Sequence, residues 1–363
     1  MRKTFVKVHL WLGVSIGLLW ALQGLSGSLL VFHREFDRFN GPAVTAGPMA
    51  SLDLIAQRSS AESEGRIERI AIIDRAGDLL TADYHDPEGE ARSLLVDAAT
   101  ADIVGRRDLE PLSPASGSFS QWLYLLHQSM LRGEESNQLT GLSGFALLAA
   151  IIAGLFIAWP RRGAWRATFN WRRWRSVDQR LYGWHRALGL AVGFILLVTV
   201  PCGLYLVFAG DFRPALARIV PHRLPYRAAP LETLPAELVG PQAALDVAES
   251  HFPGAAFVSI AMPTERSPIY AVRLRQEAEP RLWAGVTNIA VDAASGRTLD
   301  VYDPTTAPVS NRIADLAFAI HNGEVGGLAG RSLILLLGLS LPTLYGLGLW
   351  AWWRKRRRRK KRG

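Results

Sequence analysis

The stretch that decides the fold is HLWLGVSIGLLWALQGLSGSLLVF, residues 9–32. After His9 it carries no charged side chain, and about 20 apolar residues of helix are enough to cross the hydrocarbon core of a bilayer. Three more stretches without a charged side chain follow at Ser136–Pro160, Ala187–Gly210 and Ser332–Trp353. These four stretches exclude a soluble enzyme and predict a membrane α-helical fold with four transmembrane helices.

The 363 residues have a formal net charge of +9, and the basic side chains are concentrated beside the predicted spans. Residues 1–8, 160–182 and 354–363 together hold nineteen Lys and Arg and one acidic residue, Asp178, whereas acidic residues outnumber basic ones in the remaining chain. Lys and Arg next to spans mark the cytoplasmic side of a membrane. We therefore predict that both termini are cytoplasmic and that two long loops lie on the opposite side.

The opening stretch recurs as HRALGLAVGFILLVTVPCGLYLVF, residues 185–208. The offset of 176 places His9 on His185 and matches three glycines in each copy, namely Gly13, Gly17 and Gly27 with Gly189, Gly193 and Gly203. A second offset, of 194, places His127 on His321. Between them, VDAA at 96–99 matches VDAA at 291–294. This order predicts a four-helix bundle made of two parallel repeats, related by an axis along the membrane normal.

Each repeat is expected to contain a helix, an external α+β domain, a histidine and a second helix. The predicted segments are a first transmembrane helix at 1–33, an external domain at 34–120, an interfacial helix with the second transmembrane helix at 121–160, a basic cytoplasmic loop at 161–182, the third transmembrane helix at 183–210, a second external domain at 211–312, an interfacial helix with the fourth transmembrane helix at 313–353, and a basic cytoplasmic tail at 354–363.

Residue periodicity predicts the same element order in both external domains. In the second domain we expect a helix at Pro241–His251, strands at Phe257–Ala261, Ile269–Arg275 and Gly285–Asp292, and a turn ending at Gly296. In the first domain the corresponding segments are Leu52–Ser59, Ile67–Ile73, Leu79–Tyr84 and Ser93–Asp97, with Ala101 in place of the turn glycine.

Five of the eight histidines lie at membrane boundaries, where an ionisable side chain needs a partner to offset its desolvation. His9 and His185 occupy equivalent positions on the cytoplasmic side, and His127 and His321 are equivalent on the external side. A histidine pair can supply the two axial ligands of an iron in a macrocycle. The sequence therefore allows two stacked bis-histidine sites. His33 has no counterpart in the second repeat and is an alternative external ligand or a group near the substrate.

Two simpler interpretations remain open. An interfacial histidine can bond to water or a lipid headgroup, and glycines at helical spacing can serve close helix–helix packing. The packing interpretation explains the six matched glycines. It does not explain the histidine that precedes the glycines in each copy, His9 or His185. The alternative is that the glycines let a bulky, flat group approach the helix. We expect His85, His222 and His251, in the external segments, to be solvated.

Other kinds of site are disfavoured. Cys202 is the only cysteine, which excludes a thiolate iron–sulfur cluster, a cysteine-ligated zinc site and an intrachain disulfide. The basic tail is expected to be a membrane anchor attracted to anionic lipid, not a nucleic-acid-binding segment. No glycine-rich nucleotide-binding motif follows a predicted strand, so an electron donor would have to be external.

Several short motifs follow one another in a fixed order: His9-x3-Gly13, His185-Arg186-x2-Gly189 with Gly203-Leu-Tyr205, Leu126-His127 with Gly154-Leu155 and Trp159-Pro-Arg-Arg162, His321-Asn-Gly323, and the VDAATADIVG and VDAASGRTLD segments. With these motifs the chain resembles the PepSY-associated transmembrane helix family of bacterial iron-regulated inner-membrane proteins. The resemblance implies two periplasmic PepSY-like domains and two b-type haems ligated by His9, His185, His127 and His321. It also implies reduction of ferric siderophores. As a separate hypothesis, we expect the external electron donor to be a quinol or a cytoplasmic reductase.

Two other function classes stay open. Because PepSY domains resemble protease propeptides, the chain could be a membrane-anchored regulator or binding module of periplasmic proteases without redox activity. That function would leave the paired histidines unexplained. A permease is poorly supported, because the four charge-free stretches offer no proton relay or path for a charged substrate.

Overall fold

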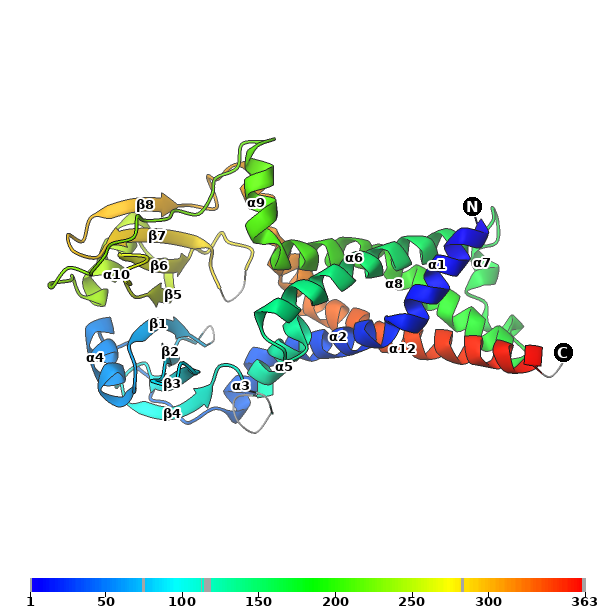
Figure 1. Ribbon diagram of the computed structural model, residues 1–363, viewed down its shortest axis with the longest axis horizontal. Helices are drawn as coiled ribbons and strands as arrows, with labels where there is room; N and C mark the ends of the chain where they lie inside the picture. The colour runs from blue at the N-terminus through cyan, green and yellow to red at the C-terminus, as the bar shows by residue number, and fades with distance from the viewer. Residues whose placement is uncertain (1, 74–75, 112, 114–118, 282–283, 361–363) are drawn as a thin grey trace. The chain divides into compact units, whose positions relative to one another are not determined.

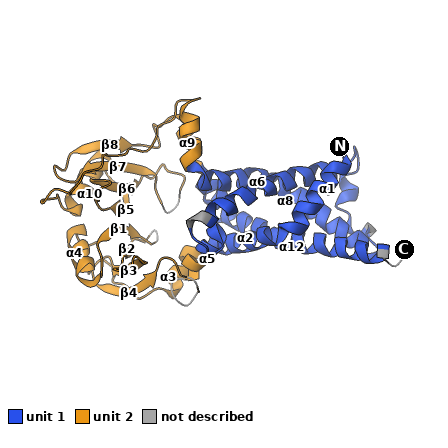
Figure 2. Ribbon diagram, viewed as in Figure 1, with its two compact units in different colours: residues 1–32, 123–209, 317–363 blue, residues 33–122, 210–316 orange. Residues whose placement is uncertain are grey.

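The computed structural model describes residues 2–73, 76–111, 113, 119–281 and 284–360. The chain divides into two compact units (Figure 2). The first, here called the helical unit, comprises residues 1–32, 123–209 and 317–363. The second, here called the sheet unit, comprises residues 33–122 and 210–316. Each unit is thus assembled from segments that lie far apart in the sequence.

The helical unit contains the long apolar helices (Figure 1). They are α1 (Arg2–Ser15), α2 (Gly17–Leu30), α6 (Glu134–Ala158), α8 (Val177–Val207) and α12 (Gly327–Lys360). In the described part of the chain, three helical segments are long and apolar enough to cross a membrane, and α1 with α2 makes a fourth if the pair forms one bent span. Shorter elements are α7 (Trp165–Thr168) and the 3₁₀ turns η1 (Trp171–Arg173) and η2 (Glu324–Gly326).

The first predicted span is not one continuous helix, which corrects the sequence prediction. Helices α1 and α2 meet at Ile16 with a bend of 66°. The hydroxyl of Ser15 donates to the carbonyl oxygen of Trp11, 2.6 Å away. Such a bond to the preceding turn competes with the helix and often bends it. In the second copy the equivalent position is Ala191, which has no hydroxyl, and α8 runs through without a break.

The sheet unit contains one eight-stranded antiparallel sheet in the order β4-β3-β2-β1-β5-β6-β7-β8 (Figure 1). Its strands are β1 (Ile67–Ile72), β2 (Leu79–His85), β3 (Ala91–Asp97), β4 (Ile103–Asp108), β5 (Ala256–Ala261), β6 (Ile269–Arg275), β7 (Thr287–Asp292) and β8 (Thr298–Tyr302). The two predicted α+β segments are therefore not separate domains. Pairing of β1 with β5 joins their sheets and removes two exposed edges.

Each half of the sheet carries one helix on the same apolar face. These helices are α4 (Leu52–Glu62) and α10 (Pro241–His251). Leu52 and Ile55 of α4 and Leu245 of α10 are buried against strand residues such as Ile70 and Val272. The remaining helices are α3 (His33–Asn40), α9 (Ala209–Ala217), α5 (Phe119–Ser129) and α11 (Val309–His321), and the last two continue from the sheet unit into the helical unit.

The fourth strand of each half was not expected from the sequence. These strands, β4 and β8, form the two edges of the sheet. In β4, Arg106 and Arg107 follow one another and interrupt the alternation of apolar and polar side chains, as is common in edge strands. Residues Asp97 and Asp292 lead into matching turns, and Ala101 adopts a φ of 60° where Gly296 has 69°. The turn is therefore the same in both halves, although the first half lacks the glycine.

Candidate functional site

The helical unit brings the four predicted ligand histidines together in two pairs. The ring centroids of His9 and His185 lie 5.9 Å apart, with 73° between the ring planes. Those of His127 and His321 lie 6.2 Å apart, with 49° between the planes. His9 lies on α1 and His185 on α8, whereas His127 and His321 lie at the ends of α5 and α11. The partners are thus the repeat-related residues.

All four imidazole rings are held by the same hydrogen bond to a neighbouring helix. The Nδ1 atoms of His9 and His185 lie 2.9 Å and 3.0 Å from the carbonyl oxygens of Ala150 and Leu344. The corresponding acceptor is Gln23 for His127, at 2.9 Å, and Thr199 for His321, at 3.0 Å. A carbonyl oxygen can only accept, so Nδ1 must carry the proton, and in the neutral imidazole the lone pair then lies on Nε2.

A glycine lies four residues after each of these carbonyls, one turn further along the same helix. A Cβ atom on Gly154 or Gly27 would lie 2.9 Å from Cε1 of His9 or 2.8 Å from Cε1 of His127. On Gly203 it would lie 2.8 Å from His321, and on Gly348 it would lie 3.1 Å from His185. The imidazole rings therefore rest against bare backbone, and a side chain at these positions would displace them.

The free Nε2 atoms suit metal ligation. Among the described residues no hydrogen bond involves Nε2 of the four histidines, and a metal-ligating histidine commonly donates its other nitrogen to a carbonyl. A metal–imidazole bond is about 2.0–2.1 Å, so two histidines on opposite sides of one metal place their ring centres about 6 Å apart. The observed centroid separations of 5.9 Å and 6.2 Å are close to this value, which also lies in the range of an ordinary contact between two aromatic rings.

Each pair by itself is too small a ligand set for a bare metal ion. No group of three or more His, Cys, Asp or Glu side chains in the described part of the chain is arranged to hold one. A macrocycle supplies the in-plane ligands and requires only two axial ones from the protein. Each histidine pair, His9 with His185 and His127 with His321, therefore has the donor set that a metal in a macrocycle requires from a protein.

The two pairs lie at different levels along the helices. His185 and Thr199, the residue that anchors His321, are both on the continuous helix α8. They are 14 residues apart, which corresponds to about 21 Å at a rise of 1.5 Å per residue. His9 and Gln23, the residue that anchors His127, have the same spacing of 14 residues across the bend between α1 and α2.

The six predicted glycines have three different surroundings. Gly27 and Gly203 contact the imidazoles of His127 and His321, so they line the second pair. Gly17 faces the ring of Tyr345, and Gly193 faces Leu155. A Cβ on Gly13 would meet no atom within 4 Å, and one on Gly189 would meet only Leu344, at 3.9 Å.

Gly348 was not identified from the sequence as a site residue, and Gly154 entered only as part of a family motif. They are related by the offset of 194 that also relates His127 and His321. Their contact with His9 and His185 crosses between helices, and spacing within one helix cannot reveal it. The repeat was the one signal that could have indicated them.

The remaining histidines belong to the sheet unit. His33 is the first residue of α3, and its carbonyl oxygen accepts a hydrogen bond from Ser120. His85 contacts Glu68, and His251 contacts Thr298. His222 differs from the expected solvated histidine: its Nδ1 lies 3.1 Å from Ser310 Oγ, and its Nε2 is buried without a hydrogen bond.

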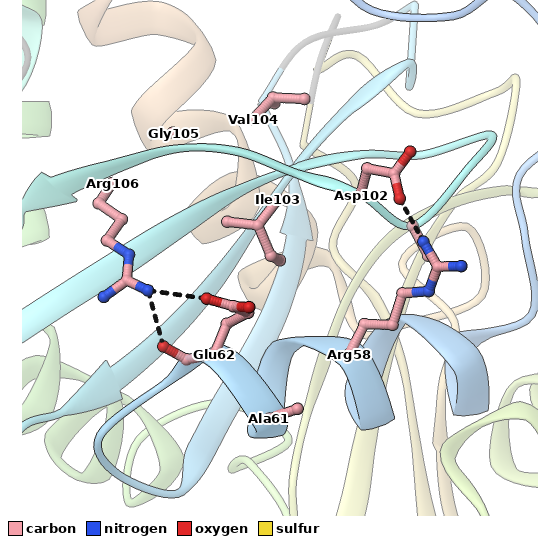
Figure 3. Close-up of a pocket in the computed structure, with 9 residues that line it drawn as sticks. Arg58, Ala61, Glu62, Asp102, Ile103, Val104, Gly105 and Arg106 are labelled. Carbon is pink, nitrogen blue, oxygen red and sulfur yellow. Dashed lines mark hydrogen bonds and ion pairs between the residues drawn. The ribbon is translucent and has the colours of Figure 1, made fainter.

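The sheet unit also has an open pocket of about 640 Å³ between α4 and β4 (Figure 3). Its charged side chains pair with one another, Arg58 with Asp102 and Arg106 with Glu62. Because these charges are already compensated, the pocket offers little to a charged ligand.

The chain matches one known family along nearly its whole length. The family model described as the PepSY-associated TM region matches residues 6–355. No curated protein matches the chain.

Proposed function

The chain belongs to the PepSY-associated TM family, and from this premise and the two histidine pairs we propose a haem-dependent electron-transfer protein of the bacterial inner membrane. It would reduce an Fe(III) chelate, such as a ferric siderophore, in the periplasm and release Fe(II). The observation that carries the proposal is the repeated arrangement of four histidines, each with Nδ1 bonded to a carbonyl and Nε2 free.

The proposed topology follows the charge distribution. The termini and the loop between α6 and α8 hold most of the Lys and Arg, which favours a cytoplasmic location for them. The sheet unit would then be periplasmic. Because equivalent contacts recur at offsets of 176 and 194, we also propose that the four spans form two parallel repeats, with α1 and α2 as one bent span.

The protein's own contribution would be to hold, orient and insulate two redox centres. His9 and His185 would ligate one haem b, and His127 and His321 the other. When bound, these groups would supply one-electron chemistry. The carbonyls of Ala150, Gln23, Thr199 and Leu344 fix the imidazole tautomers, and the glycines let the rings lie close to the backbone.

Reduction would release the metal because an oxygen-rich chelator holds hard Fe(III) more tightly than Fe(II). One electron converts one Fe(III) into one Fe(II). The chain would receive its electrons from an external donor, a quinol or a cytoplasmic reductase, because no nucleotide-binding motif was found in the sequence.

A direct test is the reduced-minus-oxidised absorption spectrum of the purified full-length protein. We expect b-type haem bands that decrease by about half in His9→Ala and in His127→Ala and disappear in the double variant. His251→Ala, which changes a histidine exposed on the sheet unit, is the matched control and should leave the bands unchanged. Absence of the bands, or bands that persist in the double variant, would refute the proposal.

A further inference from the structure

The sheet has two chemically different faces. One face is the apolar core beneath α4 and α10, formed by residues such as Ile70, Ile260 and Val272. Because side chains alternate along a strand, the residues between them point to the opposite face. That opposite face carries arginines, small side chains and Asp83, which pairs in register with Arg69 across β1 and β2. It is called here the arginine face.

The strand register places two arginines of this face diagonally across a bed of small side chains. Arg69 on β1 pairs with Ala261 on β5, which pairs with Ala271 on β6. Two residues further along β1 and on the same face, Ala71 pairs with Ser259 on β5, which pairs with Arg273 on β6. With strands about 4.8 Å apart and about 6.7 Å between alternate residues, the Cα atoms of Arg69 and Arg273 are separated by about 12 Å.

In the part of the chain that the structure describes, three arginines of this face lack a carboxylate partner. Within the described ranges, Arg69, Arg273 and Arg107 of β4 make no hydrogen bond and no ion pair with a carboxylate. Other arginines of the same unit do have such partners: Arg58 with Asp102, Arg66 with Glu265, Arg92 with Asp86 and Asp108, Arg106 with Glu62, and Arg223 with Asp300.

The surroundings of Arg273 contain an excess of positive charge. Burial lowers the pKa of Arg273, and the like charges of Arg69, Arg281 and Arg213 lower it further. Glu279 opposes this effect. Its carboxylate already accepts hydrogen bonds from the backbone N–H of Val286 and the hydroxyl of Thr287. A guanidinium stays protonated in proteins, so Arg273 is a partly desolvated cation that makes no direct ion pair among the described residues, although the charge of Glu279 acts on it at longer range.

We propose that the arginine face binds the Fe(III) chelate and selects chelates with a net negative charge. This inference rests on the proposed function and adds a substrate class to it. Carboxylate or catecholate oxygens would accept from the guanidinium groups of Arg69 and Arg273, as expected for charge-assisted bonds. Ala261 and Ala271, both half-buried, lie on this face between the two arginines, whereas Ala71 and Ser259 are buried. Arg69 and Arg273 would repel a cationic chelate.

The test measures binding without reduction, using Ga(III) chelates titrated calorimetrically into the full-length protein. Ga(III) resembles Fe(III) in its chelate chemistry but accepts no electron under these conditions. We expect the anionic Ga(III) tris-catecholate to bind at least tenfold more tightly than the cationic Ga(III) complex of desferrioxamine B, with an affinity that falls as salt is added. Arg69→Gln and Arg273→Gln should each weaken the anionic complex about tenfold.

The matched control is Arg66→Gln, which removes an arginine of the same unit that already contacts Glu265. It should bind the anionic complex like the wild type. The inference is overturned if neither chelate binds, if both bind equally, or if Arg69→Gln, at an exposed position, leaves the affinity unchanged. Haem absorption recorded on the same samples tests the proposed function separately, because its loss would not alter the Ga(III) titration.

Discussion

At the scale of single residues, the histidine sites depend on backbone that carries no side chain. We expect Gly27→Ala to displace the ring of His127, because the new Cβ would lie 2.8 Å from its Cε1. The bond from Nδ1 to the carbonyl of Gln23 would then be lost. The reduced-minus-oxidised spectrum should lose or shift the contribution of one site only, with a change in that site's midpoint potential.

Gly346→Ala is the matched control, since a Cβ at this position in α12 meets no atom within 4 Å. Its spectrum should equal that of the wild type. Identical spectra for Gly27→Ala and the wild type would show that the close contact between Gly27 and His127 does not position the ring.

A buried carboxylate in the sheet unit makes stability depend on pH. Burial raises the pKa of Asp97, but hydrogen bonds from the backbone N–H groups of Thr45, Thr100 and Ala99 outweigh it and hold the pKa below its ordinary value of 3.8. With a lower pKa in the folded state, Asp97 stabilises the fold above about pH 3.8, and this contribution is lost as the pH falls through the folded-state pKa.

We therefore expect Asp97→Asn to destabilise the sheet unit at pH 7 by about 1–3 kcal/mol, the usual cost of weakening a buried hydrogen-bonded group. The difference from the wild type should shrink below about pH 3.8. Hydrogen exchange of the β3 and β4 amides in the full-length protein measures it. An equal difference at pH 7 and at pH 3 would contradict this assignment.

At the scale of elements, α4 and α10 stabilise one another through their N-terminal turns. The carboxylate of Asp53 accepts from the backbone N–H of Gln242, and the side-chain oxygen of Gln242 accepts from the backbone N–H of Leu52. Gly240, at the N-cap of α10, has no side chain that could accept a hydrogen bond from the first N–H groups of the helix, so Asp53 takes that role. Asp53→Ala should cost about 0.5–2 kcal/mol, as for other caps.

Thermal unfolding of the full-length protein would report this loss as a lower midpoint temperature. Glu277→Ala, at an exposed position in the loop after β6, is the control and should leave the midpoint unchanged. A loss equal in both variants would mean that the contact between Asp53 and α10 does not stabilise the pair of helices.

Sequence patterns predicted those elements that follow from local chemistry. Runs without charge predicted the apolar helices, and the repeat predicted that His9 and His185, like His127 and His321, would be equivalent. Local patterns did not predict what depends on contacts between segments. The bend at Ile16 requires the bond from Ser15 to Trp11, and the contact of Gly154 with His9 joins two helices. Likewise, pairing of β1 with β5 depends on residues 188 to 192 positions apart.

At the scale of the whole molecule, the two histidine pairs would act in series. Their levels along α8 differ by about 21 Å, so either pair alone would leave a long part of the membrane without a redox centre. We therefore expect both pairs to be required for electron transfer across a bilayer. The measurement uses proteoliposomes with dithionite trapped inside, and an Fe(III) chelate with an Fe(II) indicator outside.

Wild-type protein should produce external Fe(II), and His251→Ala should do the same. His9→Ala and His321→Ala should each abolish most of the signal although each keeps one complete histidine pair, because each interrupts the series at a different level. Each variant should still show the absorption of its remaining site when dithionite is added to detergent-solubilised protein. If either single variant kept the wild-type rate, the pairs would work independently, and transfer through both sites in series would be wrong.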